Sequence, residues 1–265
     1  MEGIRRTDAI RIQGGENVRF VDKIALEEPL GIYIIHRGEK HHLGLTMRTP
    51  GCDESLVTGF LYSEGIIDSI NSIKGVELVE NTAEITLHDD VDFEVKSHNR
   101  ITTKTSACGV CGKESLSHLP HNHERPLNSK FQISSSTLLS CTEAIISAQQ
   151  LFELTGGTHA AAAFDPLGNL LCIEEDIGRH NAMDKLVGTL MLERKQIGDN
   201  LVFVSGRSSF ELAQKAIRAG FPLLASVGAV SSFAVDLARE HDLTLVSFVK
   251  EGRLVIHSSS SRIVS

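Results

Sequence analysis

Apolar positions divide the chain into a first part with short strands and a second part in which strands and helices alternate. In the first part, apolar runs that end at glycine or proline, or that alternate with polar residues, predict strands. A helical spacing between Asp53, a possible cap, and Gly65, a possible stop, predicts one helix. The predicted strands cover residues 31–38, 42–49, 75–81, 83–90 and 91–95, and the helix covers residues 53–67. We expect a small α+β module over residues 1–98.

The second part begins with apolar positions on one face of a long predicted helix, which stops at Gly156 and Gly157. A hairpin is predicted next, because Pro166 and Gly168 lie in a turn between two apolar runs. Unbroken apolar strands then alternate with amphipathic helices, which is typical of a mixed sheet that is covered on both faces and is largely parallel after the initial hairpin. The predicted hairpin strands are 159–164 and 169–175, the helices 179–193, 208–218 and 231–240, and the later strands 201–205, 222–226, 243–248 and 253–258. This predicts an α/β domain with a three-layer core over residues 131–265.

The segment between these parts, residues 99–130, has little periodicity. It holds several histidines, two prolines and two cysteines three positions apart, Cys108 and Cys111. Long irregular connections inside compact proteins are usually functional or disordered. We expect a mobile loop that carries the two cysteines.

Composition narrows the class of protein. The 265 residues are 41% hydrophobic, and the formal net charge is −8. These values are typical of a globular protein and argue against a surface that binds nucleic acid broadly. The chain has no apolar run near the ~20 residues of a membrane-spanning helix, and no apolar segment follows the basic residues at the amino terminus. We therefore expect a cytoplasmic protein with no nucleic-acid or membrane partner.

The five cysteines do not have the density of a disulfide scaffold. Cys52, Cys141 and Cys172 are explained as structural residues, whereas Cys108 and Cys111 stand outside any core pattern. The pair is compatible with three chemistries.

The first chemistry is a zinc clip, in which His118 and His123 would complete four ligands. The second is a redox pair, which fits less well because the two cysteines do not lie at a strand-to-helix junction of a βαβ unit. The third is a thiolate that accepts sulfur as a persulfide, in a glycine-containing loop that leaves the sulfur atoms accessible.

Two strand-to-helix junctions carry similar residues. "EEDIGRHNAMDK" contains Arg179 and His180, and "VSGRSSFELAQK" contains Arg207. Free N–H groups at a helix start, a glycine and an adjacent arginine together favour an anion site. The alternative is that serine and asparagine only cap the helices and the arginines are solvated. His159, Asp176 and Asp184 are equally open to structural or functional interpretations.

The order of elements in the second part resembles the cytidine-deaminase fold. Zinc deaminases place an H-x-E motif and a P-C-x-x-C motif on two of these helices. The corresponding places here hold "DIGRHNA" and "SGRSSFE", which offer no thiolate ligands. We expect the scaffold without the deaminase metal, and nucleotide deamination is disfavoured.

Longer stretches resemble a known family. "SACGVCGKESL", "TGGTHAAAAFDPLGNLLCIEEDIGRHNAMDKLVG", "VSGRSSFELAQKA" and "LTLVSFVKEGRLVIHS" are similar to the FdhD family, the accessory sulfurtransferases of formate dehydrogenase. The resemblance implies a cytidine-deaminase-like core. It also implies that a cysteine desulfurase supplies sulfur as a persulfide on Cys108, with Cys111 as a supporting thiol. The recipient would be the molybdenum cofactor in its bis(molybdopterin guanine dinucleotide) form, which formate dehydrogenase requires.

The resemblance further implies a homodimer and a cofactor-binding stretch near the carboxyl terminus. That stretch consists of Phe248, Val249, Lys250, Glu251, Gly252 and Arg253. By our own inference, the junctions with Arg179, His180 and Arg207 also contact the guanine nucleotide moieties, and a guanine nucleotide alone is expected to bind in their place. The alternative function is a non-catalytic cofactor chaperone with a structural zinc on Cys108 and Cys111. The final residues "SSSSRIVS" read as a polar tail without an evident role.

Overall fold

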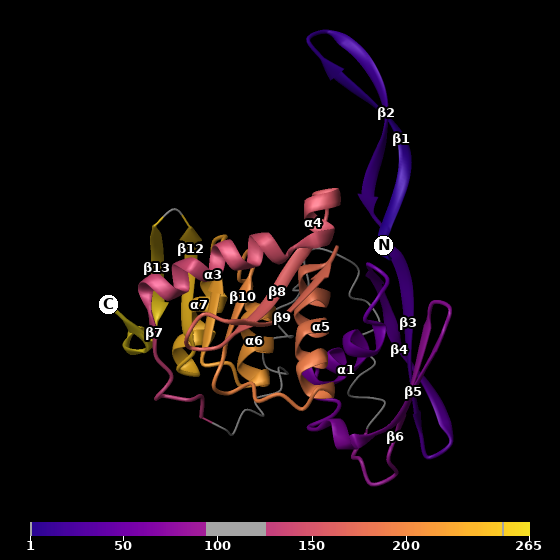
Figure 1. Ribbon diagram of the computed structural model, residues 1–265. Helices are drawn as coiled ribbons and strands as arrows, with labels where there is room; N and C mark the ends of the chain where they lie inside the picture. Colours follow the sequence, from indigo (N-terminus) through magenta and orange to yellow (C-terminus); the bar gives the residue numbers. More distant parts are fainter. Residues whose placement is uncertain (1, 94–125, 251) are drawn as a thin grey trace.

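The computed structural model describes residues 2–93, 126–250 and 252–265. It shows a mixed α/β protein, in which a six-stranded sheet has helices on both faces and a four-stranded sheet packs beside it (Figure 1). The predicted α/β class is confirmed. Within these described ranges, no helix combines the length and the apolar content that crossing a bilayer requires.

The central sheet has the strand order β13-β12-β11-β10-β8-β9. Its strands are β8 (His159–Phe164), β9 (Leu170–Asp176), β10 (Leu201–Val204), β11 (Leu223–Ser226), β12 (Thr244–Lys250) and β13 (Arg253–Ser258). The neighbours β10, β11 and β12 are parallel, whereas β8, β9 and β13 each run antiparallel to their neighbours. The prediction of a mixed sheet that is largely parallel after the initial hairpin is confirmed for β10, β11 and β12, and the antiparallel β13 is the exception. Strand β13 must be antiparallel, because the two residues after β12 are too few for the crossover that a parallel pair needs.

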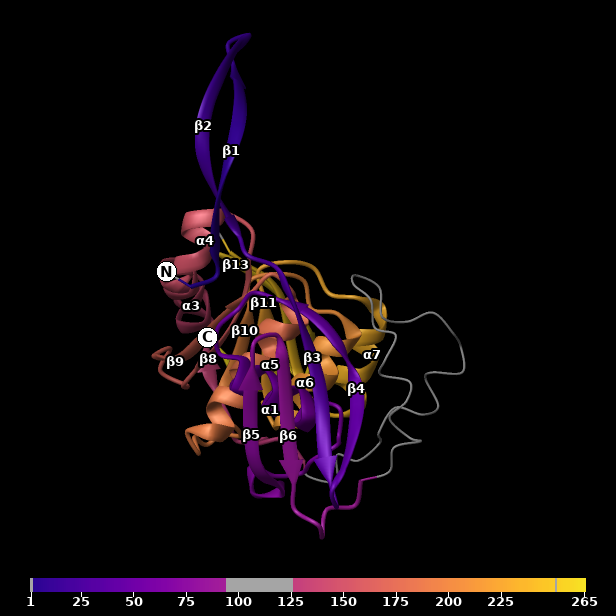
Figure 2. The ribbon, with the colours of Figure 1, turned by 90° about the vertical axis from the view of Figure 1, so that its right-hand side faces the viewer.

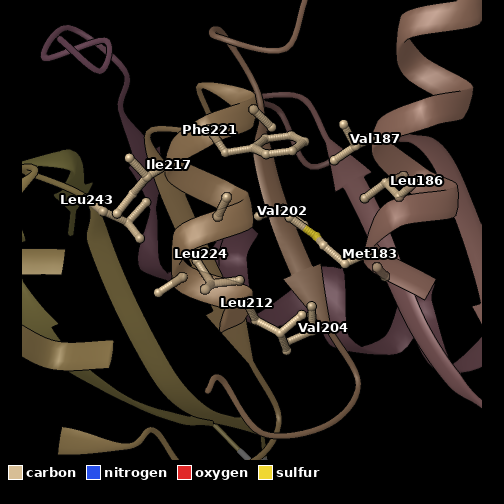
Figure 3. Close-up of a cluster of buried hydrophobic side chains, with 14 of the residues drawn as sticks. Met183, Leu186, Val187, Val202, Val204, Leu212, Ile217, Phe221, Leu224 and Leu243 are labelled. Carbon is tan, nitrogen blue, oxygen red and sulfur yellow. The ribbon is translucent and has the colours of Figure 1, made fainter. Parts of the chain in front are cut away.

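Three helices cover one face of this sheet: α5 (Arg179–Leu192), α6 (Phe210–Ala219) and α7 (Ser232–Glu240). Figure 3 shows the side chains that join these helices to the strands, among them Met183, Leu212 and Leu224, all fully buried. Helix α3 (Ser135–Ala148) covers the other face, where Leu138 and Ile145 belong to a second buried cluster.

The long predicted helix is in fact two helices. Helix α3 ends at Ala148, and α4 (Gln150–Thr155) follows after a break at Gln149. The carboxylate of Glu175 accepts hydrogen bonds from the N–H groups of Leu151 and Phe152, each at 2.8 Å. This contact satisfies N–H groups at the start of α4 and so stabilises a new helix start. Helix α4 ends at Gly156 with φ of 63°, as predicted.

The amino-terminal sheet has the order β4-β3-β6-β5. Its strands are β3 (Glu28–His36), β4 (Glu39–Arg48), β5 (Ile73–Val79) and β6 (Thr82–Leu87), with the 3-10 turn η1 (Ile70–Ser72) before β5. Helix α1 (Asp53–Ser63) packs on this sheet and also crosses α5, so it joins the two sheets. Residues 91–93 form no strand, and the rest of the strand predicted there lies outside the described residues.

Two strands that were not predicted form a separate hairpin, β1 (Ile4–Gln13) and β2 (Glu16–Ala25). Figures 1 and 2 show that it projects from the body of the protein beside α4. We call residues 4–25 the arm.

The carboxyl-terminal tail is not the featureless segment that we expected. It forms the 3-10 turn η4 (Ser260–Arg262) and the short strand β14 (Ile263–Val264), which pairs with β7 (Ile133–Ser134). Arg262 is buried, and its guanidinium lies 2.9 Å from a carboxylate oxygen of Asp242. The tail therefore holds the start of α3 against the sheet. The predicted boundaries between the amino-terminal module, the loop and the α/β domain, at residues 98 and 130, stay predictions. Leu127 lies within the predicted loop, yet its side chain belongs to the buried cluster that includes residues of α5 and α6.

Candidate functional site

The carboxyl ends of β10, β11 and β12 lie side by side, and the loops that leave them form one continuous layer. Gly228 N–H donates to the carbonyl of Gly206 at 3.0 Å, and Ser208 N–H donates to Ala229 at the same distance. Phe248 N–H donates to Gly228 at 3.2 Å. The loops after β10 and β11 and the last part of β12 are thereby connected at the edge where open α/β sheets usually bind ligands.

Arg207 lies on the first of these loops and is exposed. A Cβ atom on Gly228 would lie 2.8 Å from Gly206 O and 3.0 Å from Arg207 Cγ. Only glycine therefore permits the two loops to approach this closely. Beneath Arg207, the hydroxyl of Ser208 is buried and has no hydrogen-bond partner among the described residues.

The start of α5 is held by Asp176, which is fully buried. One oxygen of its carboxylate accepts hydrogen bonds from Gly178 N–H at 2.8 Å and from Asn181 Nδ2 at 3.1 Å. This arrangement fixes Arg179 as the first residue of the helix. The Nε atom of Arg179 is buried and has no hydrogen-bond partner within the described part of the chain.

His180 connects the start of α5 to the start of α6. Its Nε2 atom lies 2.9 Å from a carboxylate oxygen of Glu211 and 3.3 Å from Ser209 Oγ. The Arg179–His180 junction and the Arg207 junction are therefore brought together, as the analogy with open α/β sheets predicts.

His159, whose role the sequence leaves open, lies at this edge as the first residue of β8, between β9 and β10. A Cβ atom on Gly206 would lie 3.2 Å from His159 Nδ1, so the imidazole packs directly against the Arg207 loop. Burial lowers the pKa of His159 below its usual value, and the charges of Arg179, His180 and Arg207 lower it further. Asp176 acts in the opposite direction on this pKa, but the two arginines and the starts of α5, α6 and α7 favour an anion at this edge.

The stretch Phe248–Arg253 does not act as one unit. Phe248 adopts φ of 52° and is bonded to Gly228 at the edge, whereas Val249 is buried beneath α3, where its carbonyl accepts from Thr142 Oγ1. Lys250 and Arg253 pair at the end of the β12–β13 hairpin, and Gly252 between them has φ of 73°. Glu251 lies outside the described residues. No hydrogen bond or ion pair between described residues joins Lys250 or Arg253 to Arg207.

Two aromatic residues at this edge were missed. Phe210 and Phe233 lie in the first turns of α6 and α7, and their rings meet edge to face at 6.4 Å. The ring of Phe233 is 55% exposed although it is large and apolar. The available signal was an aromatic residue after two serines at each helix start, "SSF", which occurs in both segments.

The paired cysteines, Cys108 and Cys111, lie outside the described residues. The other three are not activated thiols. Burial raises the pKa of Cys52 to about 11, that of Cys141 to about 11 and that of Cys172 to about 12.

Comparison with known proteins identifies the family. The model of the FdhD/NarQ family matches residues 25–264. The sulfur carrier protein FdhD of Thermoplasma acidophilum is 43% identical over 251 residues, which cover 92% of this chain and 87% of that protein. The protein of the same name from Saccharolobus solfataricus is 37% identical over 262 residues, 98% of each chain.

The fold is also found among solved structures. One of them is a protein from Desulfotalea psychrophila that is described as a formate dehydrogenase accessory protein, with a TM-score of 0.79 and 22% sequence identity. The match covers 98% of this chain and 99% of that one. The family model and the full-length relatives confirm the resemblance found in the sequence, and the chain belongs to the FdhD/NarQ family.

Proposed function

We propose that this protein is a sulfurtransferase that carries sulfur from a cysteine desulfurase to a molybdenum cofactor destined for formate dehydrogenase. The names of the relatives, sulfur carrier protein and formate dehydrogenase accessory protein, support the role in outline. The order of elements supports a cytidine-deaminase-like core. Thiol chemistry of this kind suits the reducing cytoplasm, where we expect the protein to act.

The observation that carries the assignment of the sulfur-bearing residue is the state of the described thiols. A thiolate is the attacking species, and a thiol with a pKa near 11 or 12 is almost entirely protonated at pH 7. Cys52, Cys141 and Cys172 are all of this kind. Of the five cysteines in the chain, Cys108 and Cys111 remain as candidates.

The proposed acceptance step balances without an external oxidant. The thiolate of Cys108 attacks the outer sulfur of the desulfurase persulfide. A new S–S bond forms at Cys108, the S–S bond of the desulfurase breaks, and the desulfurase cysteine leaves as a thiolate. In the proposed release step, the thiolate of Cys111 attacks the Sγ atom of Cys108, a Cys108–Cys111 disulfide forms, the outer S–S bond breaks, and the outer sulfur leaves as hydrosulfide for the cofactor.

The cofactor is proposed to bind with its nucleotide portions at the edge described above. Its pyrophosphate groups are anionic, and the edge presents Arg179, Arg207 and three helix starts. The exposed rings of Phe233 and Phe248 offer faces for a planar guanine base. Lys250 and Arg253 would supply a second, separate contact at the β12–β13 turn.

The sulfur-bearing role is tested by intact-mass measurement after incubation with a cysteine desulfurase and cysteine. We expect the wild-type protein and a Cys172→Ala control to gain one sulfur atom, and Cys108→Ala to gain none. A gain that survives Cys108→Ala, or no gain in the wild-type protein, contradicts the assignment. The zinc content of the same samples separates this function from the alternative, a non-catalytic chaperone with a structural zinc. Stoichiometric zinc in the wild-type protein that is lost in Cys111→Ala would favour the chaperone.

The binding edge is tested through its pH dependence, with GDP as the probe. The pKa of His159 is lowered in the folded protein, and a bound anion beside it would raise that pKa, so binding takes up a proton. We therefore expect the affinity for GDP to increase as the pH falls through the His159 pKa of the bound state, and to reach a gain of about tenfold per unit rise in that pKa once the pH is below the lowered His159 pKa of the free protein. Calorimetric titration from pH 8 downward measures this.

The control variants are His159→Gln and His180→Gln, because His180 is the second histidine at this edge. The pH dependence should flatten in His159→Gln and persist in His180→Gln. An unchanged slope in His159→Gln would show that the phosphate does not lie beside His159.

A further inference from the structure

The first turns of α6 and α7 present a fixed aromatic ring beside the binding edge. The two helices lie side by side on one face of the sheet (Figure 1). Ser231 N–H donates to Ser208 O at 3.1 Å, which holds the two helix starts together. The ring of Phe233 meets that of Phe210 edge to face, yet Phe233 is 55% exposed. A ring that is fixed on one side and open on another can stack on a planar base.

Asp236 lies one helical turn beyond Phe233 on α7. Residues three positions apart share a helix face, and the side chains of a helix tilt toward its amino terminus. The carboxylate of Asp236 is therefore directed toward the turn that carries Phe233. Ala234 and Ala238 are buried, whereas Phe233 and Asp236 are exposed on the solvent side of the helix. With a rise of about 1.5 Å per residue, Asp236 stands about 4.5 Å behind Phe233 along the helix axis.

The carboxylate of Asp236 has no partner in the part of the chain that the structure describes. Among those residues it makes neither a hydrogen bond nor an ion pair. Two other carboxylates at the edge are engaged, because Glu211 contacts His180 and Asp176 holds the start of α5. Asp236 can therefore accept hydrogen bonds from a ligand without giving up a contact within the protein.

A carboxylate beside a stacked base distinguishes the two purines. Guanine presents two donors on one edge, the N1–H group and the N2 amino group, and a carboxylate accepts both. Adenine has an unprotonated N1 atom, whose lone pair would face the carboxylate, so the paired hydrogen bonds cannot form. A site built around such a polar group rejects an analogue that leaves the group unpaired. Stacking on an aromatic ring is, in contrast, available to every base.

We propose that Asp236 determines specificity for guanine by accepting hydrogen bonds from the N1–H and N2 amino groups of a base that stacks on Phe233. This inference rests on the binding edge of the proposed function and adds to it the group that recognises the base. The charges separate the two roles. Arg179, Arg207 and the helix starts favour phosphate groups, whereas a carboxylate one turn behind the start of α7 repels phosphate and favours hydrogen-bond donors.

The test is calorimetric titration of the full-length protein with GDP, ADP and xanthosine diphosphate. We expect the wild-type protein to bind GDP more tightly than ADP. Asp236→Asn replaces one acceptor oxygen by an amide donor, so it should weaken GDP binding roughly 10–100-fold and leave ADP binding nearly unchanged. Xanthine carries an oxygen acceptor where guanine carries the amino group, so xanthosine diphosphate should bind the variant more tightly than it binds the wild-type protein. Misfolding cannot produce such a gain.

Two further variants control the result. Glu240→Gln removes an exposed carboxylate one turn further along α7 and should leave all three affinities unchanged. Phe233→Leu should weaken GDP and ADP by the same factor, because stacking does not distinguish the bases.

The outcomes separate this inference from the proposed function. Equal affinities for GDP and ADP in the wild-type protein, or an unchanged preference for GDP in Asp236→Asn, overturn the role of Asp236 and leave the binding edge in place. A wild-type protein that binds neither nucleotide overturns the binding edge, and the role of Asp236 falls with it.

Discussion

Replacement of Gly188 by alanine is expected to lower the free energy of unfolding by at least about 3 kcal/mol, the upper part of the range for overpacked cores. Helices α1 and α5 cross at this residue. A Cβ atom on Gly188 would lie 1.8 Å from the carbonyl oxygen of Ser55, and one on Gly59 would lie 1.9 Å from that of Asp184. Both obstacles are backbone atoms, which cannot move aside as a side chain can.

The two helices must separate to admit the methyl group, and α5 carries Arg179 and His180 at its start. We therefore expect Gly188→Ala and Gly59→Ala to lower both stability and affinity for GDP. Urea and thermal unfolding measure the first effect, and a loss of this size corresponds to a fall in Tm of about 6–12 °C.

The matched control is Gly75→Ala in β5, where no atom lies within 4 Å of the added Cβ and where φ is not positive. It should be nearly neutral. If Gly75→Ala and Gly188→Ala destabilise equally, then glycine flexibility, and not the close crossing of α1 and α5, determines the effect.

This crossing illustrates what local sequence patterns cannot show. In the sequence, Gly59 and Gly188 are glycines within two helical patterns, where glycine is expected to lower the stability of a helix. Their role, which is to let the backbones of α1 and α5 touch, is visible only once the two helices are placed against each other. The break at Gln149 is similar. The apolar spacing continues through Gln149. The second helix starts there because its first N–H groups donate to the carboxylate of Glu175, which lies on β9.

Where local chemistry decides the structure, prediction succeeded. The turn with Pro166 and Gly168 joins β8 and β9 as expected, and Asp165 accepts the N–H groups of Leu167 and Asn169 at 2.9 Å. The alternation of strands and helices after residue 178 is also confirmed. The arm was missed although "QGGEN" is a plausible hairpin turn, because its alternating residues face no core of their own chain.

As with the fold, one part of the candidate site could be predicted from the sequence and another could not. Arg179 and Arg207 could be placed together because each follows a strand of one sheet, and the carboxyl ends of these strands, β9 and β10, lie at the same edge on either side of β8. The position of His159 between them could not be predicted, since it depends on β8 running antiparallel to β10. The sequence motif also contains Asp176, Asp184 and Lys185, whose roles depend on burial that no pattern reveals.

The buried ion pair between Lys185 and Asp176 leads to a second prediction of a large loss of stability. Lys185→Met is expected to lower the free energy of unfolding by about 3–5 kcal/mol, because it leaves the carboxylate of Asp176 buried without its cation. Lys185 Nζ lies 2.8 Å from Asp176 Oδ2 and donates to Thr49 O at 2.7 Å, and both charged side chains are almost completely buried. Thermal and urea unfolding of the purified variant measure the loss.

Two further variants distinguish the cost of leaving the Asp176 carboxylate buried without a cation from the cost of losing an ordinary lysine contact. Lys195→Met removes a lysine that is 44% exposed and lies 2.6 Å from Glu193, and it should cost less than about 1 kcal/mol. The double variant Asp176→Asn with Lys185→Met should be more stable than Lys185→Met alone, because no unpaired charge remains. If the double variant is less stable, then the hydrogen bonds that Asp176 makes to the start of α5 outweigh the cost of its buried charge. In that case GDP affinity should fall further in the double variant than in Lys185→Met, because Arg179 would lose the group that positions it.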